Sequence, residues 1–399
     1  VIRSTRHHLL DANPKKVNQY LLFLNEYDRV AKIVLAQVWA KLPSDLKIPK
    51  YLNYKEYLVD TKLSARVMSS ICTQVSGIVR AATEKQRRRL WVQENKNANI
   101  SSVKFSQPKP QHIYPELSSK CCNIQPTLHK KAKFFGFLKL YSLGEEFGSF
   151  KLPIIKHPRR GNVPKAGVKL FPSTIQLVWD VATDPIKKGD KVIGADQGIE
   201  TVLTLSDGQV TPESCRDKHT LSTILDKLAR KRKGSDAFRK AVDHRKNFIN
   251  WSIRQLNFKG VKEVRLEKIV NIRFGKSSSE KMSHWSNPEI RDSLKRRCEE
   301  LEVPIIEQSC AYRSQRCSQC GSVRKANRKG KTYTCNACGY SADADFNASV
   351  NHSVDLPDAS KFFGLKLNLG KGFYWKPTGF YTINGAELRV PLAARINRS

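Results

Sequence analysis

Residues 317–351 read CSQCGSVRKANRKGKTYTCNACGYSADADFNASVN and contain two Cys-x-x-Cys pairs separated by 14 residues. Each pair is followed by a glycine, Gly321 or Gly339, which can adopt the positive φ that completes a tight turn. Two such turns bring four thiolates to one tetrahedral ion, as in a structural zinc site without an open coordination position. Two disulfides or four unpaired thiols are the alternatives, but the basic segment between the pairs is typical of a zinc ribbon. The sequence therefore predicts one zinc ion bound by Cys317, Cys320, Cys335 and Cys338.

The chain is strongly basic. Its 399 residues include 71 Lys and Arg against 36 Asp and Glu, a formal net charge of +35. Such an excess repels itself unless a polyanion neutralises it. The basic residues are spread along the whole chain, which favours a protein built around a long stretch of nucleic acid over one with a single basic arm. A soluble basic protein of the ribosomal kind is the alternative.

Membrane insertion and export are not expected. The sequence has no apolar run of about 18 residues, the minimum for a membrane-spanning helix. The opening VIRSTRHHLL lacks the apolar core of a signal peptide, and the cysteines outside the ribbon show no paired pattern. We therefore expect a reducing compartment and no membrane partner.

Three regions differ in their periodicity. Residues from about 13 to 98 are predicted to be helical, because apolar side chains recur at helical spacing. From about 133 to 183 apolar residues alternate with period two between Gly and Pro, which predicts strands of a small β-barrel or sheet. Residues 189–311 predict the order strand–strand–helix–strand–helix–strand of an α/β domain, with one long basic helix from about 220 to 256.

Three carboxylates mark a second candidate metal site. Asp196 ends the apolar strand KVIGAD, Glu267 lies within the apolar strand VRLEKIV, and Asp345 follows the second cysteine pair. A carboxylate within an apolar strand is costly unless it is paired or binds a metal. Meeting at one edge of a sheet, the three groups would hold two Mg²⁺ ions about 4 Å apart, an arrangement that hydrolyses phosphodiesters. The alternatives are a turn role for Asp196 and a lysine partner for Glu267.

The order of these segments resembles a known family. GADQGI (194–199), a basic helical region, RLEKIV (265–270) and the cysteine segment through SADADFNASVN follow one another as in the RuvC-like nuclease core of transposon-encoded TnpB proteins. The miniature type V CRISPR effectors share this core. The match covers about residues 189–352. By position, the resemblance makes Asp196, Glu267 and Asp345 the catalytic Mg²⁺ ligands.

Two positions depart from the family pattern. Lys268 follows the second acidic residue, where an acidic residue is common, and Ala344 stands where an arginine is common. Neither departure removes a ligand. Asp343 and Asn347 would be neighbours of the site rather than its main ligands.

The resemblance also implies a domain organisation. An RNase H-like (RuvC) fold is expected over 189–311 and 339–356, interrupted by the zinc ribbon at 312–338. A β-rich, barrel-like wedge domain is expected from residues 1–12 and 99–188, and a helical recognition domain from 13–98. Residues 357–399 have no counterpart in the family pattern. The expected fold is thus α/β with additional β-barrel and helical domains.

By the same resemblance, the chain is an RNA-guided DNA endonuclease with catalytic Mg²⁺, structural zinc, a guide RNA and a target DNA. Pairing with the guide would supply sequence specificity, while the protein holds the heteroduplex by its backbone. Its expected location is the cytoplasm of a prokaryotic host, associated with the nucleoid; monomer and dimer both stay open. For each expected basic contact a solvated surface is the alternative. The expected nucleic-acid contacts are Arg87, Arg88, Arg89, Arg230, Lys231, Arg232, Lys233 and Arg313.

Two other functions fit parts of the sequence. A nuclease-inactive RNA-guided repressor would bind DNA without cutting it, but it has no need of three acidic motifs. A guide-free zinc-ribbon DNA-binding protein has no need of so large a basic N-terminal half. The presence or absence of RNA bound to the protein separates these possibilities.

Overall fold

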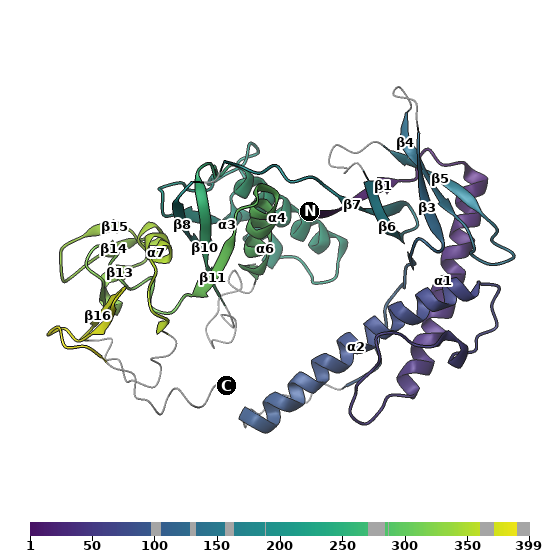
Figure 1. Ribbon diagram of the computed structural model, residues 1–399, viewed down its shortest axis with the longest axis horizontal. Helices are drawn as coiled ribbons and strands as arrows, with labels where there is room; N and C mark the ends of the chain where they lie inside the picture. The colour runs from purple at the N-terminus through teal and green to yellow at the C-terminus, as the bar shows by residue number, and fades with distance from the viewer. Residues whose placement is uncertain are drawn as a thin grey trace. The chain divides into compact units, whose positions relative to one another are not determined.

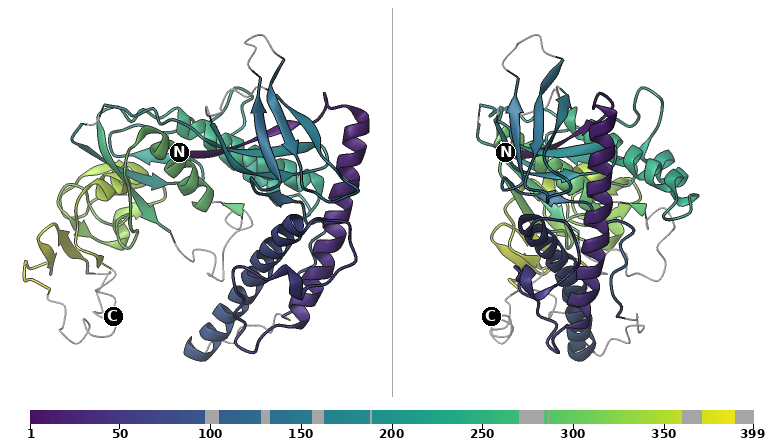
Figure 2. Two further views of the ribbon diagram at one scale, coloured as in Figure 1. Left: turned by 45° about the vertical axis from the view of Figure 1, so that its right-hand side comes forward. Right: turned by 90° about the vertical axis from the view of Figure 1, so that its right-hand side faces the viewer.

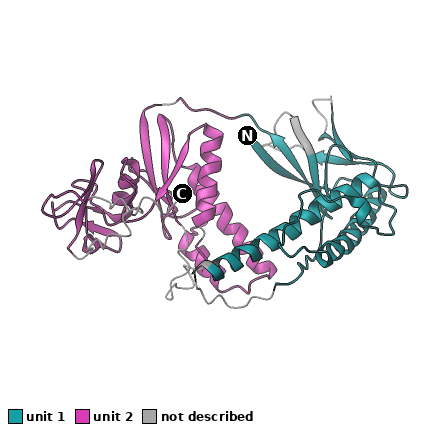
Figure 3. Cartoon of the chain, turned by 60° about the horizontal axis from the view of Figure 1, so that its bottom comes forward, with its two compact units in different colours: residues 1–182 teal, residues 183–399 magenta. Residues whose placement is uncertain are grey.

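The computed structural model describes residues 1–96, 105–127, 133–155, 163–187, 189–269, 284–285, 287–359 and 371–388. The chain forms two compact units, Val1–Ala182 and Thr183–Ser399 (Figure 3). No helix within the described ranges is long and apolar enough to cross a membrane.

Two long helices form the helical part of the first unit (Figure 1). α1 (Pro14–Ala40) starts with proline after Asn13, whose side chain accepts a hydrogen bond from a first-turn amide at 3.0 Å. Both features favour a helix start, because the first amides of a helix have no partner within it. α2 (Ala65–Lys96) packs against α1, and the Tyr27 hydroxyl donates across the pair to Gln74 Oε1 at 2.9 Å. The 3-10 helix η1 lies between them at Tyr54–Glu56.

Two antiparallel sheets complete this unit. The first has the order β1-β7-β6-β2, with bounds β1 (Ile2–His8), β7 (Thr174–Asp180), β6 (Val163–Leu170) and β2 (Glu116–Leu117). The second has the order β3-β4-β5, with bounds β3 (Cys122–Pro126), β4 (Phe134–Leu140) and β5 (Phe150–Ile155). The start of the chain therefore pairs with a distant segment: β1 runs along β7 from Ile2 opposite Asp180 to His8 opposite Thr174.

The expected β-barrel is wrong, because neither sheet is closed among the described strands. A barrel requires each strand to pair on both sides, whereas, within the described residues, β2 pairs only with β6 and β5 only with β4. The two sheets and both long helices instead share one apolar core, in which Tyr20, Phe23, Tyr27 and Trp179 are fully buried. In both views of Figure 2, α1 (purple) runs beside the strands of this unit.

A mixed four-stranded sheet in the order β11-β10-β8-β9 frames the second unit. Its strands are β8 (Lys191–Gln197), β9 (Leu203–Leu205), β10 (Val261–Lys268) and β11 (Ile305–Ser309). β8 is antiparallel to β9 and parallel to β10, and β10 is parallel to β11. The carboxyl ends of β8 and β10 consequently lie side by side at one edge of the sheet. Apolar side chains of three helices, α3 (Leu221–Ala229), α4 (Asp236–Arg254) and α6 (Asn287–Leu301), join the core of this sheet.

The single basic helix expected from about 220 to 256 is two helices, α3 (Leu221–Ala229) and α4 (Asp236–Arg254). Gly234 has a φ of +87°, and the Ser235 hydroxyl accepts a hydrogen bond from the Phe238 amide at 3.1 Å. The positive φ of Gly234 turns the chain after α3 has ended at Ala229, and the capping serine begins α4. The third helix of this unit, α6, spans Asn287–Leu301.

The cysteine segment folds as two small antiparallel sheets. One sheet contains β13 (Arg328–Lys329), β14 (Thr332–Thr334) and β15 (Ser341–Asp343), after the 3-10 helix η3 (Lys325–Asn327). The other contains β12 (Ser322–Val323), β16 (Phe373–Lys376) and β17 (Gly379–Tyr381). The C-terminal extension thus supplies two strands to the ribbon, and the Trp375 amide donates to Gly321 O at 2.9 Å. The helix α7 (Ala344–Ser353) follows β15 and packs onto β8.

Candidate functional site

Four cysteine sulfurs meet in the ribbon. The Sγ atoms of Cys317 and Cys338 are 3.7 Å apart, those of Cys320 and Cys335 are 3.6 Å apart, and all four lie within 4.8 Å of one another. In a tetrahedral site with Zn–S bonds of about 2.3 Å, neighbouring sulfurs are about 3.8 Å apart. The donor type and the spacing therefore both fit one zinc ion.

Each cysteine pair sits on a tight turn closed by its glycine. Gly321 and Gly339 have φ values of +80° and +75°. Their amides donate to the carbonyl oxygens of Cys317 and Cys335 at 3.0 Å and 2.9 Å. A Cβ on Gly321 would also lie 2.8 Å from Trp375 O, closer than side chains tolerate. Glycine is thus required there both for the turn and for the close approach of β16.

The acidic site begins at the neighbouring strands β8 and β10. Asp196 and Glu267 are each 8% exposed, and their strands are in register with Ala195 opposite Leu266. The backbone amide of Gln197 donates to Glu267 Oε1 at 2.8 Å, which fixes that carboxylate against β8. Two acidic groups thus meet at the carboxyl edge of the sheet.

Asp196 and Glu267 line one cavity, which we call the acidic cavity. Helix α7 brings the third predicted carboxylate, Asp345, to this cavity. Asp343 caps the helix by accepting hydrogen bonds from the amides of Asp345 and Phe346, both at 2.9 Å. Gly194 on β8 permits the close approach of α7, because a Cβ there would overlap the Ser349 carbonyl oxygen. One small residue on β8 therefore sets how near the helix comes to the strand carboxylates.

Two cations of the ribbon hold Asp345. Arg328 approaches its Oδ1 at 2.9 Å and Lys331 its Oδ2 at 2.5 Å. These residues come from β13 and the adjoining hairpin turn, so the ribbon reaches back to the acidic cavity. At the acidic cavity, the donor groups that meet within 4.8 Å of one another are Asp196, Glu267 and His352, and Asp345 is not among them.

Burial makes the strand carboxylates hard to ionise. It is the main cause that raises the pKa of Glu267 to about 7, with a further contribution from Asp345. Burial, Glu267 and Asp345, in that order, raise the pKa of Asp196 well above its usual range. A bound cation would remove this penalty by stabilising the charged forms.

His352 is a residue of this site that was not predicted from the sequence. This side chain is 1% exposed and lines the acidic cavity. Burial, followed by the positive charge of Arg313, lowers its pKa to about 3, so the ring is neutral near pH 7. Position 352 is seven residues after Asp345 on one helix, which places both on the same helix face. That spacing is the signal that would have revealed it.

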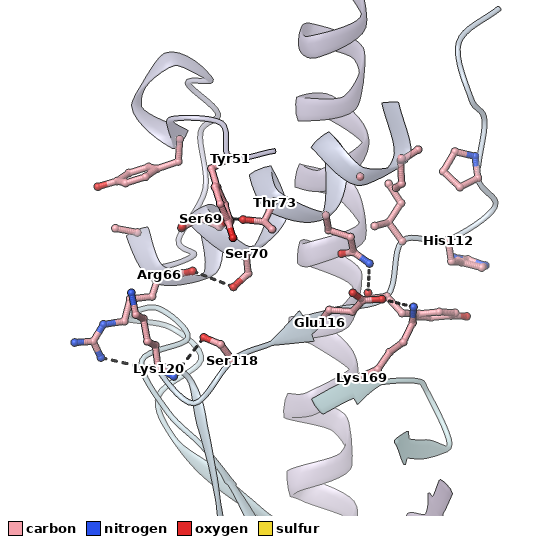
Figure 4. Close-up of a pocket in the computed structure, with 18 of the residues that line it drawn as sticks. Tyr51, Arg66, Ser69, Ser70, Thr73, His112, Glu116, Ser118, Lys120 and Lys169 are labelled. Carbon is pink, nitrogen blue, oxygen red and sulfur yellow. Dashed lines mark hydrogen bonds and ion pairs between the residues drawn. The ribbon is translucent and has the colours of Figure 1, made fainter. Parts of the chain in front are cut away.

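Each unit has a cavity lined partly by polar side chains. The acidic cavity has a volume of about 710 Å³. A cavity of about 1110 Å³ in the first unit lies between α2 and the segment from Pro110 to Lys120. Figure 4 shows its hydroxyl groups on α2, with Arg66 and Lys120 close together. Arg66 Nη1 donates to Lys120 O at 3.4 Å. The sequence argument did not single out this lining.

The predicted basic contacts lie in three different settings. Arg87 and Arg88 are exposed and Arg89 is half-buried near the end of α2, where Arg87 approaches Glu84 at 3.0 Å. Residues 230–233 are exposed in the turn between α3 and α4 rather than on one long helix. The four residues of that turn are Arg230, Lys231, Arg232 and Lys233.

Arg313 differs from its predicted role as a nucleic-acid contact. It is 4% exposed, donates to Ser309 O at 3.1 Å and to Asn351 O, and its guanidinium stacks over the Trp375 ring at 5.2 Å. A guanidinium enclosed in this way cannot also reach a phosphate. Arg313 instead ties α7 to the strand that the C-terminal extension contributes.

The second unit is thus an α/β domain with an acidic cavity beside an inserted four-cysteine ribbon. Residues 288–352 match a family model described as Cas12f1-like, TNB domain. The CRISPR-associated endodeoxyribonuclease Cas12f1 of Sulfoacidibacillus thermotolerans is 30% identical over 157 residues, which are 38% of this chain and 34% of that protein. The Cas12f1 of Syntrophomonas palmitatica is 25% identical over 104 residues, 26% of this chain and 20% of that protein.

These matches confirm the predicted resemblance to the TnpB-like, miniature type V family. The chain matches about a third or less of the length of these two curated relatives. Among solved structures, a Cas12f1–sgRNA–target DNA complex is similar with a TM-score of 0.41 and 13% identity, covering 85% of this chain and 82% of that one. The mini-RNA-guided endonuclease CRISPR-Cas_phi3 gives a TM-score of 0.47 and 9% identity, covering 88% and 92%.

Proposed function

We propose that this protein is an RNA-guided DNA endonuclease whose second unit carries a RuvC-like active site. The observation that carries the proposal is the meeting of Asp196 and Glu267, buried on neighbouring parallel strands, with Asp345 lining the same cavity. The curated relatives that match this chain are described as endodeoxyribonucleases. An RNase H-like core is supported by the mixed sheet, in which β8 is antiparallel to β9 and parallel to β10.

In this proposal Asp196, Glu267 and Asp345 hold divalent metal ions, Mg²⁺ in the first instance. Their carboxylate oxygens are the donors that Mg²⁺ prefers, and two buried carboxylates side by side need a cation to remain charged. Such ions supply charge stabilisation at the phosphodiester and lower the pKa of water. The Gln197 amide orients Glu267, and Lys331 and Arg328 balance the charge of Asp345.

The ribbon is proposed to hold one structural zinc through Cys317, Cys320, Cys335 and Cys338. Four filled positions leave no site for substrate on that ion. Its role is mechanical: it fixes the hairpin from which Arg328 and Lys331 reach Asp345.

Guide RNA and target DNA are the proposed partners, since a net charge of +35 requires a polyanion of matching size. The first unit is proposed as the wedge (1–12 and 99–188) and recognition (13–98) domains, with two open sheets in place of a barrel. The proposed contacts to the sugar–phosphate backbone are exposed Arg87 and Arg88 and the cavity of Figure 4 in the first unit, and the turn at 230–233 in the second. Hydroxyl and cationic groups lining one cavity are suited to phosphate oxygens.

Sequencing the RNA that co-purifies with the protein tests the guided part of the proposal. A discrete structured RNA with a variable end is expected, and its origin in a repeat or at a transposon end separates the two lineages. Protein free of RNA that still binds DNA would instead support a guide-free zinc-ribbon binder. Guided binding with no cleavage in Mg²⁺ or Mn²⁺ would support the repressor.

A further inference from the structure

A buried imidazole shares the acidic cavity with the two strand carboxylates. One ring nitrogen of His352, one oxygen of Asp196 and one oxygen of Glu267 all lie within 4.8 Å of one another. All three side chains are more than nine-tenths buried. Two come from neighbouring strands and the third from the helix that packs on them, so three separate elements converge on one point.

Two buried polar atoms at this cavity have no hydrogen-bond partner in the described part of the chain: His352 Nδ1 and Gln197 Oε1. A buried polar atom left unpaired loses the hydrogen bonds that water gives it in the unfolded chain, which destabilises the fold. Such atoms in a folded protein call for an explanation, and an absent ion is one of the few available. The amide oxygen carries lone pairs, as does Nδ1 in the tautomer protonated at Nε2, and both residues line the cavity that contains the carboxylates.

The spacing of the three donor groups suits a single ion. For bonds of about 2.1 Å, opposite ligands of an octahedral ion are about 4.2 Å apart. Donor atoms within 4.8 Å of one another therefore need only a small contraction to share one ion. The Gln197 amide already holds Glu267 at 2.8 Å, and the close packing of α7 at Gly194 holds His352, so the donors are positioned before an ion binds.

We propose that Asp196, Glu267 and His352 bind one divalent ion as a mixed carboxylate–imidazole site, and that this ion is Mn²⁺ in preference to Mg²⁺. This proposal rests on the proposed function in one respect: it names the metal of the acidic site to which that function is assigned. Mg²⁺ takes oxygen ligands and retains several waters, so an imidazole adds little to its binding. Carboxylates favour hard ions such as Mg²⁺ and Mn²⁺, while affinity for nitrogen rises through the transition metals. Mn²⁺ accommodates both kinds of donor.

Metal binding by the full-length, zinc-loaded chain without nucleic acid tests this site. Mn²⁺ is titrated by calorimetry, and Mg²⁺ is titrated alone and as a competitor. His352→Gln is expected to weaken Mn²⁺ binding by at least about tenfold, the lower range for a disturbed metal site, and to leave Mg²⁺ binding within about twofold. The matched control is His244→Gln, which removes a half-buried imidazole that contacts His219, outside the cluster. This control is expected to bind both ions as the wild type does.

Because His352 is buried, a second measurement on the wild-type protein guards against a variant that fails to fold. Electron spin-echo spectroscopy of bound Mn²⁺ is expected to show coupling to a ¹⁴N nucleus, unchanged in His244→Gln. Absence of that coupling, or equal Mn²⁺ affinity in a folded His352→Gln, overturns the proposal. Nitrogen coupling in a protein that cuts no DNA would refute the nuclease and leave the metal site standing. DNA cleavage by a protein whose bound Mn²⁺ shows no nitrogen coupling would refute the metal site and leave the nuclease standing.

Discussion

Replacing Glu267 by Gln should stabilise the second unit at alkaline pH while removing a proposed metal ligand. Glutamine keeps an oxygen that can accept the hydrogen bond from the Gln197 amide. It carries no charge, so the cost of ionising a buried group between Asp196 and Asp345 disappears. The effect therefore grows with pH.

The magnitude follows from the pKa of about 7 that burial and Asp345 give Glu267, against an ordinary value of 4.5. A carboxyl with a raised pKa in the folded state binds its proton more tightly there than in the unfolded chain. Its stabilising contribution is complete below pH 4.5 and is lost as the pH rises through about 7. Because a tenfold difference in proton affinity is about 1.4 kcal/mol, the wild type should lose about 2–3 kcal/mol relative to Glu267→Gln between pH 5 and pH 8.

Urea unfolding at pH 5 and pH 8, followed by hydrogen exchange in a peptide containing β8, measures this difference in zinc-loaded protein. Glu307→Gln on β11 is the matched control, and it should leave the stability difference between pH 5 and pH 8 almost unchanged. The hydrogen bond from Lys295 lowers the pKa of Glu307, so its contribution is present above its unfolded pKa and lost as the pH falls. An excess of Mn²⁺ or Mg²⁺, at about 100 times its Kd, should restore about 2.7 kcal/mol to the wild type and much less to Glu267→Gln. Equal pH dependence of wild type and Glu267→Gln would refute the buried, coupled carboxyl.

Three further changes have defined outcomes. Cys335→Ser should abolish zinc binding, measured as zinc per chain by native mass spectrometry; unchanged zinc content would exclude the four-thiolate site. Gly194→Ala should destabilise the second unit by about 1–3 kcal/mol in urea unfolding, because the added methyl group overlaps the Ser349 carbonyl oxygen; wild-type stability would show that α7 does not pack there. Arg66→Ala with Lys120→Ala should weaken RNA or DNA binding and reduce the slope of log affinity against log salt by about 1–2; an unchanged slope would remove the first-unit cavity from the nucleic-acid path.

Much of the second unit could be predicted from local patterns in the sequence. The cysteine spacing and the two following glycines specify turns within a few residues, and such turns depend little on distant contacts. Asp196 and Glu267 stood out because charged groups within apolar strands need a partner. The break between α3 and α4 was not predicted, because a run of basic residues suggested one continuous helix. Gly234 and Ser235 are typical of a turn and a helix start, and they could have indicated the break.

Features that depend on tertiary contacts were not readable from one sequence. An alternating pattern fixes which face of a strand is buried, but not whether the last strand pairs with the first, so barrel and open sheets look alike. Nothing in the sequence around Arg313 indicates that its guanidinium is covered by Trp375, which lies far along the chain. Likewise, nothing local in residues 357–399 shows that part of this segment completes the ribbon sheet through pairing of β12 with β16.

The most direct measurement is cleavage by the purified protein of a DNA duplex matched to the guide portion of its co-purifying RNA. The account predicts metal-dependent cutting of the matched duplex and none of a scrambled one. Asp196→Ala is expected to bind guide and target nearly as the wild type does and to leave the DNA intact. Cleavage by Asp196→Ala at the wild-type rate, or cutting that ignores the guide sequence, would contradict the account.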